Sequence, residues 1–326
     1  MVSFQSKFVR SLEARGVEYS FDLQDADLSA MLLIGGPRSA MQFGNSKRAD
    51  IPIAQRLDGI NWLHRKTRTG WRHWLRAEIN NGMLRRVRNS VAKRVIYQSH
   101  FIQAWWHQKH GPSSGREYII HNGVDLDHFS PAKKKGNDST KIEILMVEGN
   151  IDGGYELGLK SAIELANYLI ARKGAKVSLR VAGKVSEAIK NSSQIQGGDE
   201  IEWLGVVPNP DLPEYYRAAD MLFSADLNAA CPNAVIEALA CGLPVVAFNT
   251  GALGEMLDAK SGALADYGGD PWELDAADIP ALGAAALRIK DDQAHYRQGA
   301  RARAEEVFDL EQMTDKYLEV LIPDGE

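Results

Sequence analysis

The stretch "PNAVIEALACGLPVVAFNTG", residues 232–251, is almost wholly apolar yet holds one carboxylate, Glu237, in its first half. Pro232 suits the start of a helix and Gly242 suits the position just past its end, so the stretch predicts a short helix over residues 232–241. Since apolar residues lie on nearly every side of that helix, we expect it to be buried.

The run "PVVAF" (244–248) predicts a buried strand, and "NTGALGE" (249–255) then turns into another helix. Helix and strand run in opposite directions, so Glu237 is expected near the strand's carboxyl edge, where ligands bind in open α/β sheets. A buried carboxylate is costly unless it is hydrogen-bonded. The two hydroxyls of a ribose would supply such bonds, while backbone N–H groups of the loop hold its phosphates. The alternative is that Glu237 caps its own helix or pairs with a nearby Arg or Lys.

The 326 residues are 44% hydrophobic and 25% charged, which is typical of a globular protein and favours two domains. No apolar run is long enough for a membrane span and the N-terminus does not resemble a secretion signal, so we expect a cytoplasmic protein. With two cysteines, Cys231 and Cys241, and no Cys/His cluster, neither a disulfide framework nor a zinc site is expected. Residues 1–131 hold 19 Lys+Arg against 11 Asp+Glu, and the remainder holds 19 against 32. This asymmetry indicates an anionic partner for the first half.

Short apolar runs alternate with helical patterns along the whole chain, which predicts parallel sheets covered by helices on both faces. The expected strands are residues 30–34, 51–57, 93–99, 116–123, 141–149, 176–183, 201–207, 221–225 and 244–248. The expected helices are residues 6–16, a basic region from 62, a helix from 100, 158–174, 211–219, 232–241 and 308–321. The polar, lysine-rich segment 130–141 is the best candidate linker. We therefore predict an N-terminal domain over residues 1–131 and a C-terminal domain over 132–309, with a last helix at about 310–326 returning to the first domain.

The second half is similar to the donor-binding half of the family-4 retaining glycosyltransferases. The resemblance rests on "IEWLGVVPNPDLPEYYRAADMLFSADLNAAC" and "PNAVIEALACGLPVVAFNTGALGE", with weaker matches in "AKRVIYQSHFIQAWWHQKHG", "YIIHNGVDLDHFSP" and "FDLEQMTDKYLEVL". It implies the GT-B fold, in which two Rossmann-like doubly wound parallel-sheet domains face a cleft.

The resemblance also implies roles for single residues. Glu237 would be the second glutamate of the family's E-x7-E motif and would bind the ribose of the nucleotide. The donor-binding residues implied or proposed with it are Gly149, Asn150, Gly153, Gly154, Lys184, Val206, Val207, Asn228, Asn233, Gly251, Ala252 and Leu253.

Two departures from the family pattern concern charge. The first motif glutamate falls on Ala229, and the usual Arg and Lys after the first strand of the second domain are replaced by "VEGNIDGGYELG" (147–158). Glycine N–H groups there would cradle phosphate. Lys184, after the next strand, is expected to supply the missing cation, unless it is an ordinary surface lysine.

In the first domain, Asp58 stands roughly where the family has a histidine facing the donor sugar. Asp58 would bind acceptor or donor hydroxyls or assist proton transfer, with help from Arg56; the alternative is an aspartate that caps a turn. Gly35, Gly36 and Arg38 in "IGGPRSA" are expected to line the same acceptor side.

These features predict transfer of a sugar, with retained anomeric configuration, from a nucleoside diphosphate sugar such as UDP-glucose to a hydroxyl of a saccharide or lipid-linked acceptor. Asp58, Lys184 and Glu237 would carry the reaction, and the resemblance implies that no metal and no cofactor beyond the nucleotide sugar are required. The alternative from another class is a non-catalytic nucleotide-sugar-binding protein, suggested by Ala229 and the missing Arg/Lys pair.

Residues 62–94 hold ten Lys+Arg against one acidic residue, and Trp71, Trp74, Leu75 and Ile79 fall on one stripe of the expected helix. We favour the interpretation that the stripe packs on the sheet while the arginines form a solvated or phosphate-facing wall. The alternative is a basic amphipathic segment that contacts an anionic membrane and associates the protein with it. Nucleic acid is not an expected partner of so acidic a chain.

Overall fold

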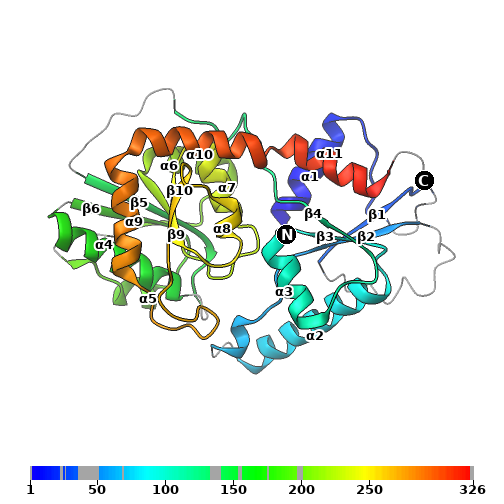
Figure 1. Cartoon of the computed structure of the whole chain (residues 1–326), viewed down its shortest axis with the longest axis horizontal. Helices are drawn as coiled ribbons and strands as arrows, with labels where there is room; N and C mark the ends of the chain where they lie inside the picture. Colours follow the sequence, from blue (N-terminus) through cyan, green and yellow to red (C-terminus); the bar gives the residue numbers. More distant parts are fainter. Residues whose placement is uncertain are drawn as a thin grey trace. The chain divides into compact units, whose positions relative to one another are not determined.

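The chain forms two compact units, shown in a computed structural model that describes residues 2–22, 25, 27–35, 51–67, 70–132, 141–152, 156–174, 176–196 and 201–323 (Figure 1). The first unit comprises Met1–Arg65, Thr69–Gly123 and Phe308–Glu326, and the second comprises Lys66–Arg68 and Val124–Val307. The predicted linker, residues 130–141, lies mostly outside the described residues.

The first unit is built on a parallel sheet in the order β1-β2-β3-β4. Its strands are β1 (Met31–Ile34), β2 (Ile53–Leu57), β3 (Arg94–Tyr97) and β4 (Arg116–Ile119). Helices α2 (Trp71–Ser90) and α3 (His100–His110) cover one face, and α1 (Val2–Ala14) and α11 (Leu310–Leu321) cover the other (Figure 1). The turn η2 (Leu63–Arg65) precedes α2.

Helix α11 belongs to the core of the first unit although it comes last in the chain. The rings of Phe4 and Phe8 lie 5.1 and 5.3 Å from that of Tyr317, which is fully buried. Arg15 of the first unit also bonds the carboxylate of Glu311 at 2.8 Å. The apolar stripes of α1 and α11 are therefore buried against each other and the sheet.

The second unit has a six-stranded parallel sheet in the order β10-β9-β8-β5-β6-β7. Its strands are β5 (Lys141–Asn150), β6 (Lys176–Lys184), β7 (Ile201–Gly205), β8 (Met221–Ser224), β9 (Val245–Phe248) and β10 (Gly262–Ala265). Its helices and turn are α4 (Glu156–Lys173), α5 (Glu187–Ser192), η4 (Asn209–Asp211), α6 (Leu212–Ala218), α7 (Asn233–Ala240), α8 (Leu253–Met256), α9 (Ile279–Asp291) and α10 (Gln293–Val307). Numbered within the unit, this is the strand order 3-2-1-4-5-6 of a doubly wound nucleotide-binding sheet.

One expectation about packing is wrong. The stripe on α2 does not pack on the sheet, because Trp71, Trp74, Leu75 and Ile79 are all exposed. The side of α2 that packs on its own unit carries Ala77, Leu84 and Val87 instead. The helix thus has apolar residues on two opposite sides, and a sequence pattern does not tell which of them is buried.

Candidate functional site

The carboxyl edge of the second sheet holds the residues that sequence analysis selected. Strand order reverses between β5 and β8, so the loops after these two strands diverge and leave room for a ligand. Leu145 of β5 lies beside Leu222 of β8, and a few residues later both strands pass into loops. Glu148 lies near the carboxyl end of β5, and Asp226 lies two residues past the end of β8.

Glu237 is buried on α7, with 3% of its surface exposed. Its Oε1 accepts a hydrogen bond from Nδ2 of Asn209 at 3.0 Å, and its Oε2 accepts one from the hydroxyl of Tyr216 at 3.3 Å. These two neutral donors are among the contacts of Glu237, and each carboxylate oxygen has more than one acceptor site. The alternative of a helix cap does not fit, because the cap residue of α7 is Pro232.

The loop after β9 contacts the loop after β8 through a glycine. Gly251 has φ +60°, and a Cβ there would lie 2.5 Å from the backbone nitrogen of Ala229, so another residue would not fit. The N–H of Ala252 donates to the carbonyl of Ala229 at 2.9 Å. The sequence predicted that the backbone of Gly251, Ala252 and Leu253 would hold phosphate. The N–H of Ala252 already has an acceptor within the protein.

Asn228 is the one asparagine of the described residues with positive φ, at 55°. Only 6% of it is exposed, and its Nδ2 has no hydrogen-bond partner among the described residues. A buried amide donor without an acceptor is costly, and a bound ligand would relieve that cost. Asn228 directly precedes Ala229, the position of the missing motif glutamate.

Glu148 and Asp226 are the residues that sequence analysis missed. Loss of solvent around the carboxylate, and then the charge of Asp226, raise the pKa of Glu148 to about 8. Loss of solvent likewise raises the pKa of Asp226 to about 6, although its side chain keeps an exposed surface. The only available signal was the position of each residue at or just past the carboxyl end of an expected strand.

The other predicted donor residues lie along the same edge. Asn150 pairs with Lys184 across β5 and β6, and the carbonyl of the exposed Lys184 accepts a bond from the N–H of Ile151 at 3.0 Å. Gly149 is exposed beside Asn150. Val206 and Val207 follow β7, with Val206 exposed, and Asn233 begins α7. Gly153 and Gly154 lie outside the described residues.

The carboxyl edge of the first sheet is organised by Arg56, of which 2% is exposed. Its guanidinium bonds Oδ1 of Asp58 at 2.8 Å and Oδ1 of Asn122 at 2.7 Å, and lies over the ring of Phe4. Asp58 is half-exposed, and its carbonyl accepts from the indole of Trp106. Arg56 therefore positions the Asp58 carboxylate through its Oδ1.

Gly35 belongs to this edge as well. It follows β1 with φ +73°, and its N–H donates to the carbonyl of Arg56 at 3.1 Å. The other two predicted residues of the acceptor side, Gly36 and Arg38, lie outside the described residues.

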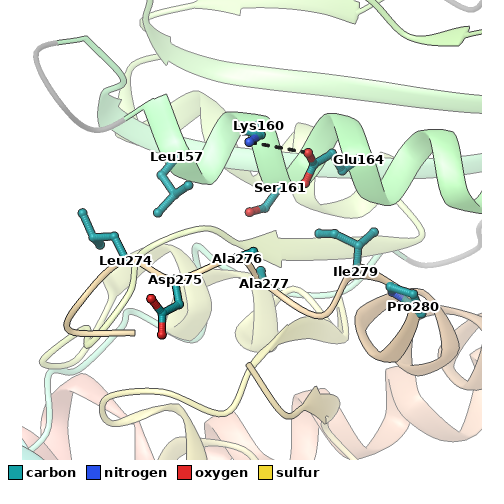
Figure 2. A pocket seen from close by; sticks show the side chains of 10 residues that line it. All are labelled: Leu157, Lys160, Ser161, Glu164, Leu274, Asp275, Ala276, Ala277, Ile279 and Pro280. Carbon is teal, nitrogen blue, oxygen red and sulfur yellow. Dashed lines mark ion pairs between the residues drawn. The ribbon is translucent and has the colours of Figure 1, made fainter. Parts of the chain in front are cut away.

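A pocket of about 580 Å³ lies elsewhere in the second unit, between α4 and the segment before α9 (Figure 2). Its walls include Leu157 and Ile279, with the ion pair of Lys160 and Glu164 at one side. None of the predicted donor-binding residues lines it.

Within the described ranges, no group of three or more His, Cys, Asp or Glu side chains is suited to hold a metal ion. Metal independence stays a prediction. No helix in the described part of the chain has the length and apolar character needed to cross a bilayer. Both cysteines are buried, and neither takes part in a disulfide.

Residues 143–283 match the family model described as Glycosyl transferases group 1. D-inositol 3-phosphate glycosyltransferase 2 of Catenulispora acidiphila is 28% identical in an alignment of 197 residues that covers 56% of this chain and 46% of that protein. The chain thus spans about half the length of the curated relatives it matches.

Solved structures resemble nearly the whole chain. Sucrose-phosphate synthase from Thermosynechococcus elongatus has a TM-score of 0.70 at 18% identity, over 97% of this chain and 77% of that one. Anabaena HepE in complex with UDP-glucose has a TM-score of 0.59 at 19% identity, over 89% and 79%. These likenesses confirm the predicted GT-B architecture of two parallel-sheet α/β units.

Proposed function

We propose, from the match of residues 143–283 to the family model of the group 1 glycosyltransferases, that the chain transfers a sugar from a nucleoside diphosphate sugar to an acceptor hydroxyl. The observation that carries the proposal is Glu237, a buried carboxylate held by Asn209 and Tyr216 next to the strand-order reversal. A carboxylate fixed in this way is suited to accept hydrogen bonds from the two hydroxyls of a ribose.

The donor we propose is UDP-glucose, for a chain that acts in polysaccharide or glycolipid synthesis. Support comes from the likeness to HepE, whose structure holds UDP-glucose. Val206 and Val207 would present backbone groups to the base, and the N–H groups at Gly149 and Gly251 would face the diphosphate. Asn228 would bind a hydroxyl of the sugar, where the family has a glutamate.

The proposed reaction retains the configuration of the sugar. The acceptor oxygen attacks the anomeric carbon on the face from which the nucleotide leaves, while the bond from that carbon to the diphosphate oxygen breaks. The departing phosphate oxygen takes the proton of the acceptor hydroxyl. Lys184 stabilises the charge that develops on the diphosphate, and Asp58 binds acceptor hydroxyls. Neither a metal nor a further cofactor enters this scheme.

A second candidate function is nucleotide-sugar binding without turnover. It is favoured by Ala229 in place of the motif glutamate and by Glu148, an acid in the segment where the family has Arg and Lys. Carboxylates near a diphosphate weaken its binding while they are charged. The raised pKa of Glu148, about 8, reduces this repulsion near neutral pH because the carboxyl stays largely protonated.

One experiment separates the two functions. Purified protein is incubated with UDP-glucose, GDP-mannose and other nucleotide sugars, with and without EDTA, while binding is followed by thermal shift and UDP or GDP release by a coupled assay. We expect binding of UDP-glucose together with release of UDP that EDTA does not abolish. Binding without release, with acceptors supplied, would support the non-catalytic alternative, and absence of both would contradict the proposal.

A further inference from the structure

Helix α2 carries an apolar stripe that the described part of its own unit leaves largely exposed, although the ring of Trp74 meets that of His64 edge-on at 6.2 Å. The exposed fractions are 71% for Trp71, 46% for Trp74, 46% for Leu75 and 54% for Ile79. At 100° per residue these side chains centre on the side of the helix opposite to Ala77, Leu84 and Val87, which pack on the unit. The stripe extends for about 12 Å along the helix axis, at 1.5 Å per residue.

Arginines flank this stripe. Arg72, Arg76, Arg85 and Arg86 are exposed on the same helix, and the guanidinium of Arg72 lies 5.4 Å from the ring of Trp71. Glu78 is the single acidic residue of segment 62–94. It is bound by Arg65 at 2.6 Å and by His64 at 2.8 Å, on the side of η2. The electrostatic potential at the surface of the stripe is therefore positive.

The position of the stripe along α2 also favours an external partner. Asn81, in the middle of the helix, accepts a bond from the backbone N–H of Asn61, which follows β2 by a few residues. Since α2 runs antiparallel to the strands, its residues before Asn81 extend past the carboxyl edge of the sheet. That is the edge at which Asp58 lies.

We propose that this face of α2 docks the protein on an anionic phospholipid surface, with Trp71, Trp74, Leu75 and Ile79 among the acyl chains and the arginines at the headgroups. Trp and aliphatic side chains on one side, with arginines at its borders, suit the boundary between headgroups and acyl chains. An anionic lipid surface complements the charge of the arginines. A second copy of the chain does not, because a two-fold contact would bring the same arginines of both copies together and they would repel each other. Leu75 and Ile79 have no base-stacking face, which disfavours nucleic acid.

Docking in this orientation brings the carboxyl edge of the first sheet towards the lipid. An acceptor hydroxyl carried on a lipid headgroup would then meet Asp58 without leaving the surface. The docking itself does not depend on sugar transfer, so its test does not require an active enzyme.

The test is co-sedimentation of the full chain with vesicles of phosphatidylcholine alone or with about one third phosphatidylglycerol. We expect at least tenfold stronger partition to the anionic vesicles, a blue shift of tryptophan emission, and loss of most binding from about 50 to about 500 mM NaCl. The triple variant Trp71→Ala/Leu75→Ala/Ile79→Ala should lose at least tenfold in partition. A matched triple, Tyr19→Ala/Phe21→Ala/Ile322→Ala, removes exposed apolar side chains elsewhere on the same unit and should bind as the wild type.

The charge is tested separately. Arg72→Gln/Arg76→Gln/Arg86→Gln should lose at least fivefold on anionic vesicles, whereas the control Arg116→Gln/Arg172→Gln/Lys316→Gln should lose less than twofold. Three outcomes overturn the proposal. The first is equal vesicle binding by the wild type and the apolar triple variant. The second is loss of binding in the arginine variant alone, which would indicate a phosphate-binding face that does not insert into the bilayer. The third is a wild-type protein that binds no vesicles but forms a concentration-dependent dimer, which the apolar triple variant abolishes. Failure of UDP-glucose turnover in the same preparation would leave this result unaffected.

Discussion

The two sheets of the protein end in edges of different character. In the second unit the edge combines a buried acceptor, Glu237, with a buried donor, Asn228, whose Nδ2 has no partner among the described residues. In the first unit the main buried polar group is Arg56, which bonds Asp58 and Asn122 through its two terminal nitrogens but whose Nε has no partner among the described residues. Each edge thus holds a buried nitrogen without a hydrogen-bond partner among the described residues, Nδ2 of Asn228 in one and Nε of Arg56 in the other. We call the edge with Asn228 and Glu237 the binding edge, because the proposed donor would bind there. We call the edge at which Arg56 holds the carboxylate of Asp58 the supporting edge. Substitutions at each of the two edges test this comparison.

The largest expected effect is on the supporting edge. Arg56→Ala removes the hydrogen bonds of Arg56 to Asn122 and Asp58 and its packing against Phe4, so we expect a loss of about 3 kcal/mol in the free energy of unfolding. Urea denaturation measures this loss. The exposed Arg172→Ala should change stability by no more than about 0.5 kcal/mol. Equal stabilities would mean that Arg56 does not organise this edge.

The next effect concerns the contact between the two donor loops. Gly251→Ala places a Cβ 2.5 Å from the backbone of Ala229 and should cost about 2 kcal/mol, with weaker UDP binding because the loops separate. Gly174→Ala is the control, since Gly174 also has positive φ, +59°, but a Cβ there would have no other atom within 4 Å. It should cost about 1 kcal/mol and leave UDP affinity unchanged. Similar UDP affinities in both variants would argue against a ligand at these loops.

Lys184→Ala tests the proposed cation of the binding edge. We expect about a tenfold lower kcat, about 1.4 kcal/mol, with a smaller change in UDP-glucose affinity, because charge on the diphosphate grows during the reaction. Lys176→Ala removes a lysine from the opposite end of the same strand and serves as the control. Steady-state kinetics would exclude Lys184 from the mechanism if kcat were the same in both variants.

Glu148 gives the binding edge a pH dependence. Its folded-state pKa, about 8, lies above the ordinary value of 4.5, so stability present at acid pH is lost as the pH rises towards and through 8. Glu148→Gln removes that loss. The thermal midpoint of the variant minus that of the wild type should therefore increase between about pH 5 and about pH 9. UDP affinity should fall over the same interval in wild type and much less in the variant. Parallel pH profiles would show that Glu148 does not titrate at the site.

Sequence patterns were most informative at residues whose backbone suits few positions, such as proline at the start of a helix and glycine just past its end. Pro232 and Gly242 bracket α7 as expected, and Gly242 has φ +68°. The short apolar runs correctly predicted nine of the strands observed, in a parallel arrangement. Strand β10 and helices α5, α9 and α10 were not predicted. The β10 sequence "GALA" is too short and too small in side-chain volume to indicate a strand.

The candidate site was harder to predict than the fold. Glu237 was selected because a lone carboxylate in an apolar helix needs a reason to be there, but its partners Asn209 and Tyr216 come from another turn and helix and have no sequence signal. Glu148 and Asp226 lie close enough for their charges to interact because β5 and β8 are neighbours in the sheet, and the sequence does not show which strands are neighbours. The exposure of the α2 stripe depends on how far the helix extends beyond its sheet. Each of these is a tertiary property that local patterns do not contain.

The most direct test of the central claim is a calorimetric titration of UDP into wild type and Glu237→Gln, with Glu214→Gln on the neighbouring exposed surface as the control. Gln keeps the volume of the side chain but loses the charge and an acceptor, so we predict at least tenfold weaker binding, about 1.4 kcal/mol, in a variant that stays folded. The Glu214→Gln protein should bind UDP as the wild type does. Equal UDP affinity in wild type and Glu237→Gln would contradict the assignment of Glu237 to the nucleotide and, with it, the proposed donor site.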